Sequence, residues 1–158
     1  LMWRARRGPH AMLVWGTVNP AGEGGNYRGF FFTGEDIHKC VSQGEMVGKP
    51  VKIEHKGMDV GRVVSAWRNA RGQMDCVLEL AQNNLQGAVI SKFIGQGVCR
   101  ELSLGYTVDV RNSKEGITAT NKKIVEVSIV KKGARDDCFI HGFTVPPPSP
   151  KRRRTGTQ

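Results

Sequence analysis

Apolar and polar side chains alternate along most of this chain, and the pattern predicts a protein built mainly from β-strands. Successive side chains of a strand point to opposite faces, so a strand with one buried face shows an apolar residue at every second position. The alternating runs are short, and segments rich in glycine, proline or asparagine separate them. We expect strands at residues 12–18, 27–32, 50–55, 59–69, 73–81, 100–110, 123–132 and 136–145.

Two segments have the period of a helix instead. In residues 33–45, Thr33 has the character of an N-cap, and Asp36 follows three residues later as in a capping box. Residues 83–97 place apolar side chains three and four positions apart, which predicts a second helix. Its apolar positions are Leu85, Val89, Ile90, Phe93 and Ile94.

The order of these elements indicates the fold class. Strand mostly follows strand, with two helices inserted and a polar turn expected at residues 111–122. This order is typical of a mainly β protein with peripheral helices (α+β), and it favours a small closed antiparallel β-barrel. We expect one domain over residues 12–145, a leader or remnant at 1–11 and a Pro-rich basic tail at 146–158, with both ends disordered.

The formal net charge of +10 first suggests a nucleic-acid-binding protein, but most of the charge lies at the two ends. Arg4, Arg6 and Arg7 contribute three positive charges, and residues 151–154 contribute four. Residues 12–150 therefore have a net charge of only +3. They also lack an interleaved set of aromatic and basic residues that would stack on bases, so we expect no more than weak binding of nucleic acid by the tails. No apolar run is long enough to predict a membrane span.

The four cysteines are too far apart in sequence to predict a metal site. Cys40, Cys76, Cys99 and Cys138 include no C-x-x-C or C-x-x-H pair. We interpret them as reduced and mostly buried thiols, and we expect neither a metal nor another cofactor.

The segment RELSLGYTVDV, residues 100–110, contains a serine between two leucines. Alternation places Leu102, Leu104 and Tyr106 on one face and Glu101, Ser103, Gly105 and Thr107 on the other. This polar face is either a solvated outer surface of the sheet or a site in which small side chains surround a nucleophilic serine. A serine becomes a nucleophile only where a base accepts its proton and a third group orients that base.

His55 and Glu126 are the candidates for these two roles. His55 lies where the strand 50–55 gives way to a glycine-containing turn, and such strand ends commonly present functional side chains. In IVEVSIV, Glu126 points away from the face of Val127 and could orient a histidine if this strand lies beside that of Ser103. The alternative for Glu126 is an ordinary glutamate on an exposed sheet face.

The motifs KIEHKGMDVGRV, ELSLGYTV and IVEVSIV, in this order, resemble the prohead (capsid maturation) proteases of tailed phages and the related herpesvirus assemblins. The resemblance covers residues 12 to about 145. It implies a serine protease with a small barrel flanked by helices, in which Ser103 is the nucleophile, His55 the general base and Glu126 the orienting residue. Herpesvirus assemblins have a second histidine in place of Glu126, so the third residue follows the phage pattern.

The resemblance also implies an oxyanion site after the third strand. Assemblins use a glycine and two arginines there, and in KKGARDD the best matches are Gly133 and Arg135. Ala134 replaces the first arginine, although a main-chain N–H at this position could still donate to the oxyanion.

The tail and the resemblance together suggest where such an enzyme would act. The run Lys151, Arg152, Arg153 and Arg154 after PPPSP reads as a nuclear localisation signal, or else as a solvated basic tail. We expect an enzyme of the host nucleus and the assembling capsid that cleaves scaffold protein and itself, forms a homodimer and meets the major capsid protein. The alternatives are a nuclear nucleic-acid-binding adaptor with basic tails and an inactive protease that serves as a scaffold.

Overall fold

The computed structural model describes residues 11–21 and 29–144, which form seven strands and two helices. The predicted mainly β, α+β class is therefore confirmed. The leader up to residue 10 and the basic tail, including residues 151–154, lie outside the described residues. The elements are β1 (Met12–Asn19), α2 (Gly34–Ser42), β2 (Pro50–Ile53), β3 (Lys56–Arg68), β4 (Met74–Leu80), α3 (Leu85–Gly95), β5 (Glu101–Ser113), β6 (Gly116–Val130) and β7 (Ile140–Phe143).

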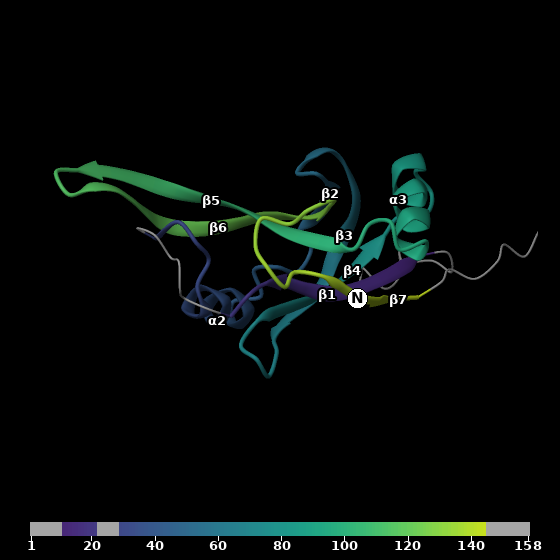
Figure 1. Ribbon diagram of the computed structural model, residues 1–158, viewed down its shortest axis with the longest axis horizontal. Coiled ribbons are helices and arrows are strands. Elements are labelled where there is room, and N and C mark those ends of the chain that lie inside the picture. Colours follow the sequence, from purple (N-terminus) through teal and green to yellow (C-terminus); the bar gives the residue numbers. More distant parts are fainter. Residues whose placement is uncertain (1–10, 22–28, 145–158) are drawn as a thin grey trace, which may run out of the picture.

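All seven strands belong to one sheet with the order β5-β6-β2-β3-β4-β1-β7 (Figure 1). Neighbouring strands are antiparallel except β2 and β6, which run parallel with Val51 opposite Val127 and Ile53 opposite Ile129. This parallel pair places the end of β2 beside the C-terminal end of β6. Segments that are about 75 residues apart in sequence, around 53 and 128, thus become neighbours.

The predicted closed barrel is wrong, because the sheet stays open. Among the described residues, one isolated bridge links the region of its two edges, between Glu101 of β5 and Phe139 just before β7. Two hydrogen bonds support this bridge, from Leu102 N to Cys138 O (2.9 Å) and from Ile140 N to Arg100 O (2.8 Å). Since β7 has only four residues and pairs with β1, no continuous ladder joins it to the long strand β5.

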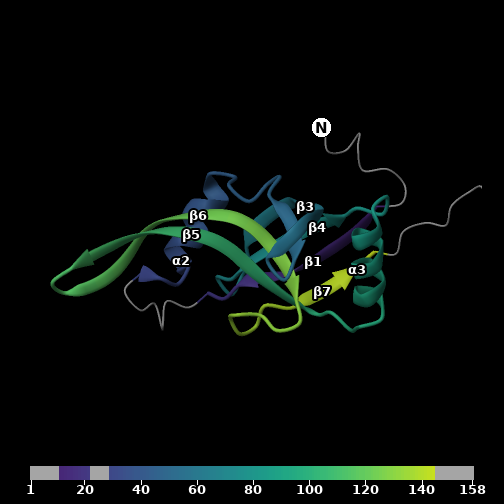
Figure 2. The ribbon, with the colours of Figure 1, turned by 90° about the horizontal axis from the view of Figure 1, so that it is seen from above.

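Two local predictions also need correction. Residues 111–122, predicted as a polar turn, continue the ladder of β5 and β6, which turns only between Ser113 and Gly116. The resulting hairpin projects far from the rest of the sheet (Figures 1 and 2). Pattern analysis missed it because a ribbon whose side chains are mostly exposed needs no apolar alternation. Of the strand predicted at 27–32, the described residues 29–32 are not strand.

The helices begin as predicted, but they bury fewer apolar residues than expected. Thr33 caps α2 and forms the capping box with Asp36. Helix α3 buries Ile90 and Ile94 but leaves Leu85, Val89 and Phe93 exposed. No helix within the described ranges is long and apolar enough to cross a membrane.

Candidate functional site

The turn between β2 and β3 presents His55 to the sheet. Ile53 pairs with Lys56, so Glu54 and His55 are the two central residues of a tight hairpin. Both have positive φ, 52° and 64°, as a type I′ turn requires, and non-glycine residues pay roughly 1–2 kcal/mol each for this conformation. Hydrogen bonds to β6 hold the turn, from Glu54 N to Ile129 O (3.1 Å) and from His55 N to Ser128 Oγ (2.9 Å).

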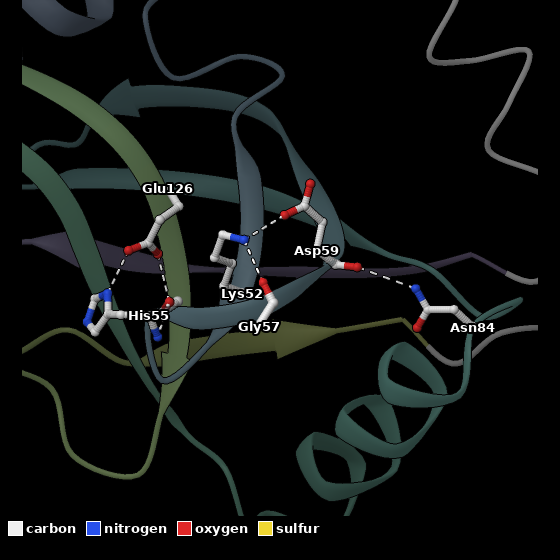
Figure 3. A network of polar contacts seen from close by, with 7 residues as sticks. Lys52, His55, Gly57, Asp59, Asn84 and Glu126 are labelled. Carbon is white, nitrogen blue, oxygen red and sulfur yellow. Dashed lines mark hydrogen bonds and ion pairs between the residues drawn. The ribbon is translucent and has the colours of Figure 1, made fainter.

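The side chains of Ser103, His55 and Glu126 form a continuous chain of contacts. His55 Nε2 lies 3.0 Å from Ser103 Oγ, and His55 Nδ1 lies 2.7 Å from Glu126 Oε2. Figure 3 shows the contact between His55, on its turn, and Glu126 on β6. The antiparallel register of β5 and β6 places Ser103 opposite Ser128 and Gly105 opposite Glu126, so both strands present their polar side chains to His55.

Burial distinguishes these residues from ordinary surface groups. Glu126 is 5% exposed and Ser103 is 6% exposed, whereas the His55 side chain is 42% exposed. The two alternatives left open by the sequence, a glutamate on an exposed sheet face and a serine on a solvated face, are therefore wrong. The polar face of β5 and β6 is covered here and is reached from solvent at His55.

The geometry determines the hydrogen-bonding roles of the imidazole. An ionised carboxylate only accepts hydrogen bonds, so in neutral His55 the proton lies on Nδ1 and points to Glu126. Nε2 is then left with a lone pair that accepts the hydroxyl proton of Ser103. This arrangement can transfer a proton from the hydroxyl to the imidazole and stabilise the imidazolium that forms.

Gly105 leaves the space that the Glu126 carboxylate occupies. A Cβ at position 105 would collide with Oε2 of Glu126, the oxygen that contacts His55. The absence of a side chain at this position is therefore a requirement of the site and not a matter of backbone freedom.

The residues matched to an oxyanion site lie in the loop between β6 and β7, and two carboxylates hold this loop. Glu54 accepts a hydrogen bond from Lys131 N (2.8 Å), and Glu101 accepts one from Gly133 N (2.7 Å). The Gly133 N–H is thus already engaged. Arg135 stacks its guanidinium 4.8 Å from the centre of the Phe31 ring, and its Nη1 is buried without a hydrogen-bond partner among the described residues.

A small cavity of about 120 Å³ connects these groups. Ser103, Ala134 and Arg135 line it together with Leu104, Tyr106 and Cys138. The structure therefore brings Ser103 close to Ala134 and Arg135. A cavity lined by a serine and by an arginine that has a buried, unpartnered guanidinium nitrogen fits a negative charge that forms there.

Burial makes the four cysteines poor nucleophiles. None of the four forms a disulfide, as expected from the sequence. Burial raises the pKa of Cys138, the thiol in the cavity, to about 12, and it has the same effect on Cys40 and Cys76. Burial also raises the pKa of Cys99. These thiols stay protonated near neutral pH, and a thiol is a much weaker nucleophile than a thiolate.

The other described histidines lie elsewhere. His38 is on α2, and His141 Nε2 contacts Thr17 Oγ1 at 2.8 Å. Sequence reasoning missed two contacts of this region. The Ser128 hydroxyl donates to Glu126 Oε1 (2.7 Å), and Glu101, at the start of β5, binds the loop at Gly133 N. The spacing of Glu126 and Ser128, two residues apart on one strand face, was the available signal for Ser128.

Comparisons with known proteins gave matches among solved structures but not among sequences. No protein-family model matches the sequence, and no curated protein matches it. Among solved structures, the chain is similar to the KSHV protease in complex with a hexapeptide phosphonate inhibitor, with a TM-score of 0.60 and 13% sequence identity. It is also similar to the varicella-zoster virus protease, with a TM-score of 0.53 and 16% identity.

These matches cover 85% and 84% of this chain but only 65% and 64% of the two viral proteases. The chain thus spans about two thirds of their length. The resemblance to herpesvirus assemblins inferred from the motifs is confirmed for the fold.

Proposed function

We propose that this chain is a viral serine endopeptidase in which Ser103 is the nucleophile, His55 the general base and Glu126 the residue that orients the base. The observation on which the proposal depends is the contact chain from Ser103 Oγ through both ring nitrogens of His55 to Glu126, at 3.0 Å and 2.7 Å. The shared fold with two herpesvirus proteases supports it.

Each step of acyl transfer has a group in this site. Ser103 Oγ attacks the carbonyl carbon of the peptide bond while His55 Nε2 takes the hydroxyl proton. His55 then gives that proton to the leaving amine, and the C–N bond breaks to form an acyl-enzyme. A water molecule, deprotonated by the same nitrogen, hydrolyses the ester and restores Ser103.

Arg135 is the best candidate to stabilise the tetrahedral intermediate. Arg135 and Ser103 line the same cavity, and the Nη1 of Arg135 is buried without a hydrogen-bond partner among the described residues, so an oxyanion in the cavity could supply that acceptor. The phosphonate inhibitor of the KSHV protease is consistent with such a site, because its phosphorus is tetrahedral like the carbon of that intermediate. The Gly133 N–H could take part only after leaving Glu101.

The biological part of the proposal is capsid maturation. We expect the enzyme to cleave a scaffold protein and its own precursor, in the host nucleus, as the resemblance to prohead proteases and assemblins implies. A homodimer is part of this expectation, and the exposed Leu85, Val89 and Phe93 on α3 offer apolar surface for it. Sedimentation of the chain and of its Val89→Asp variant tests the dimer.

A fluorophosphonate probe tests the enzyme proposal without knowledge of the substrate. The probe should label the native protein at Ser103, and Ser103→Ala should abolish labelling and lower peptide hydrolysis by about 10⁴-fold to 10⁶-fold. Ser91→Ala is the matched control, since Ser91 is also buried but lies on α3. Labelling of the Ser103→Ala variant at the native rate would remove the proposal.

The alternative, a nucleic-acid-binding adaptor, has a separate test. Its support is the charge of the two ends. Salt-dependent binding of duplex DNA that persists after deletion of residues 1–11 and 146–158 would favour the adaptor. We expect the binding to disappear with these segments.

A further inference from the structure

Ser128 lies behind the contact chain and touches two of its members. It is on β6, two residues after Glu126, and it is completely buried. Its Oγ donates a hydrogen bond to Glu126 Oε1 at 2.7 Å and accepts one from the main-chain N–H of His55 at 2.9 Å. A single hydroxyl thus connects the orienting carboxylate to the backbone of the general base.

The direction of these bonds is fixed by the chemistry of the partners. The carboxylate can only accept and the amide N–H can only donate, so the hydroxyl proton must point to Glu126. Alanine could make neither bond. It would leave the His55 N–H and one carboxylate oxygen without these partners, and the loss is costly for the carboxylate oxygen because Glu126 is buried.

The bond to His55 acts on a strained and accessible turn. His55 has a φ of 64° and follows Glu54, which also has positive φ, and its side chain is partly exposed. Burial therefore cannot fix the imidazole by itself. The hydrogen bonds of Glu54 N and His55 N to β6 fix the turn relative to Ser103.

The bond to Glu126 selects which carboxylate oxygen faces the imidazole. Ser128 occupies Oε1, which leaves Oε2 for His55 Nδ1. Gly105 provides the space for Oε2 on the opposite side. The carboxylate is thus held in one orientation by the hydroxyl donor of Ser128 on its own strand and by the absence of a side chain at Gly105 on the neighbouring strand.

We infer that Ser128 is a positioning residue that holds Glu126 and the His55 turn in the geometry required for proton transfer from Ser103. This inference rests on the proposed function of the site. Ser128 is completely buried and its hydroxyl bonds to Glu126 and the His55 N–H, so we expect it to act on the rate of the chemical step and not on substrate binding.

The test compares Ser128→Ala, Ser128→Thr and the control Ser91→Ala by the kinetics of fluorophosphonate labelling. Ser128→Ala should lower the maximal labelling rate constant by about 100-fold, because small displacements of a catalytic base have effects of this size. The half-saturating probe concentration should stay within about threefold, and Ser128→Thr, which keeps the hydroxyl, should recover most of the rate. ¹⁵N NMR of His55 should show the Nδ1–H tautomer in the native protein and a mixture of tautomers in Ser128→Ala.

The outcomes separate this inference from the proposed function. A Ser128→Ala variant that is labelled at the native rate, while Ser103→Ala is not labelled, would overturn only the inference. A general loss of stability with an unchanged His55 tautomer would overturn it as well. If Ser128→Ala does not fold, hydrogen exchange at the His55 amide of the native protein decides: protection supports the bond to Ser128, and exchange at the free-peptide rate refutes it.

Discussion

The two halves of the β5–β6 hairpin differ sharply although the same two strands form both. In the site half, residues 101–106 and 124–130, most side chains of β6 are buried on both faces. In the arm, residues 107–123, most side chains are exposed and the backbone ladder continues to the turn (Figure 2). Two register shifts, between Gly105 and Tyr106 and between Thr107 and Asp109, separate the halves.

The comparison shows that strand pairing alone does not make a site. Both halves have the same antiparallel hydrogen bonds, but only the site half has a third strand, β2, paired along β6. The turn that follows this strand presents His55 to the part of the sheet where Ser103, Glu126 and Ser128 are buried. Polar side chains that are buried in the site half must find hydrogen-bond partners within the protein, so their contacts show how the site is organised.

The largest effect should come from a change in the site half that leaves the ladder intact. Gly105→Ala places a methyl group where Glu126 Oε2 lies, so the carboxylate must leave His55. We expect the rate of fluorophosphonate labelling to fall by about 100-fold to 10⁴-fold, the range that loss of an orienting carboxylate produces. The matched control is Gly95→Ala on α3, where nothing lies within 4 Å of the new methyl group. A labelling rate for Gly105→Ala within threefold of native would contradict the role of Glu126.

The next effect concerns stability and compares one apolar residue from each half. Leu102 is fully buried in the site half, whereas Val110 in the arm is 60% exposed. Leu102→Ala should lower the free energy of unfolding by about 2–5 kcal/mol, and Val110→Ala should change it by less than about 0.5 kcal/mol. Urea denaturation followed by circular dichroism measures both. Similar losses in the two variants would show that the arm packs against the body in solution.

The smallest effect tests how the base of the arm is attached to α2. Lys122 Nζ lies 3.0 Å from Asp36 Oδ2, and Asp36 also accepts hydrogen bonds from Thr33. Partial burial acts to raise the pKa of Asp36, but the hydrogen bonds from Thr33 and Lys122 outweigh it and hold the pKa below its ordinary value of 3.8. Because the pKa is lowered in the folded state, the ionised carboxylate stabilises the protein above pH 3.8, and this contribution disappears as the pH falls through the lowered value.

Asp36→Asn should therefore cost up to about 1 kcal/mol at pH 7, and the difference should shrink as the pH falls through the lowered pKa and native Asp36 also becomes neutral. Thermal unfolding of both proteins over this pH range measures the difference. Lys122→Ala should reproduce part of the loss, and Lys123→Ala, at the next position, should not. A difference between Asp36→Asn and native protein that is independent of pH would show that the charge contributes nothing.

Local patterns in the sequence predicted both helices, most of the strands and the mainly β class, but not the arm of β5 and β6. Together with the motif resemblance they indicated the candidate residues. The capping box of Thr33 and Asp36 depends on residues three apart, and alternation depends on residues two apart, so both can be read from short segments. The same alternation placed Glu126 and Ser128 on one face. It could not show whether that face is solvated or buried.

Tertiary structure alone decided how these pieces meet. His55 contacts Ser103 and Glu126 across 48 and 71 residues of sequence, and the parallel pairing of β2 with β6 has no local signal. The open sheet, the space at Gly105 and the two bonds of Ser128 likewise follow from the packing of distant strands. Side-chain patterns report each residue's immediate neighbours in the chain, whereas a site depends on distances between segments that only folding brings together.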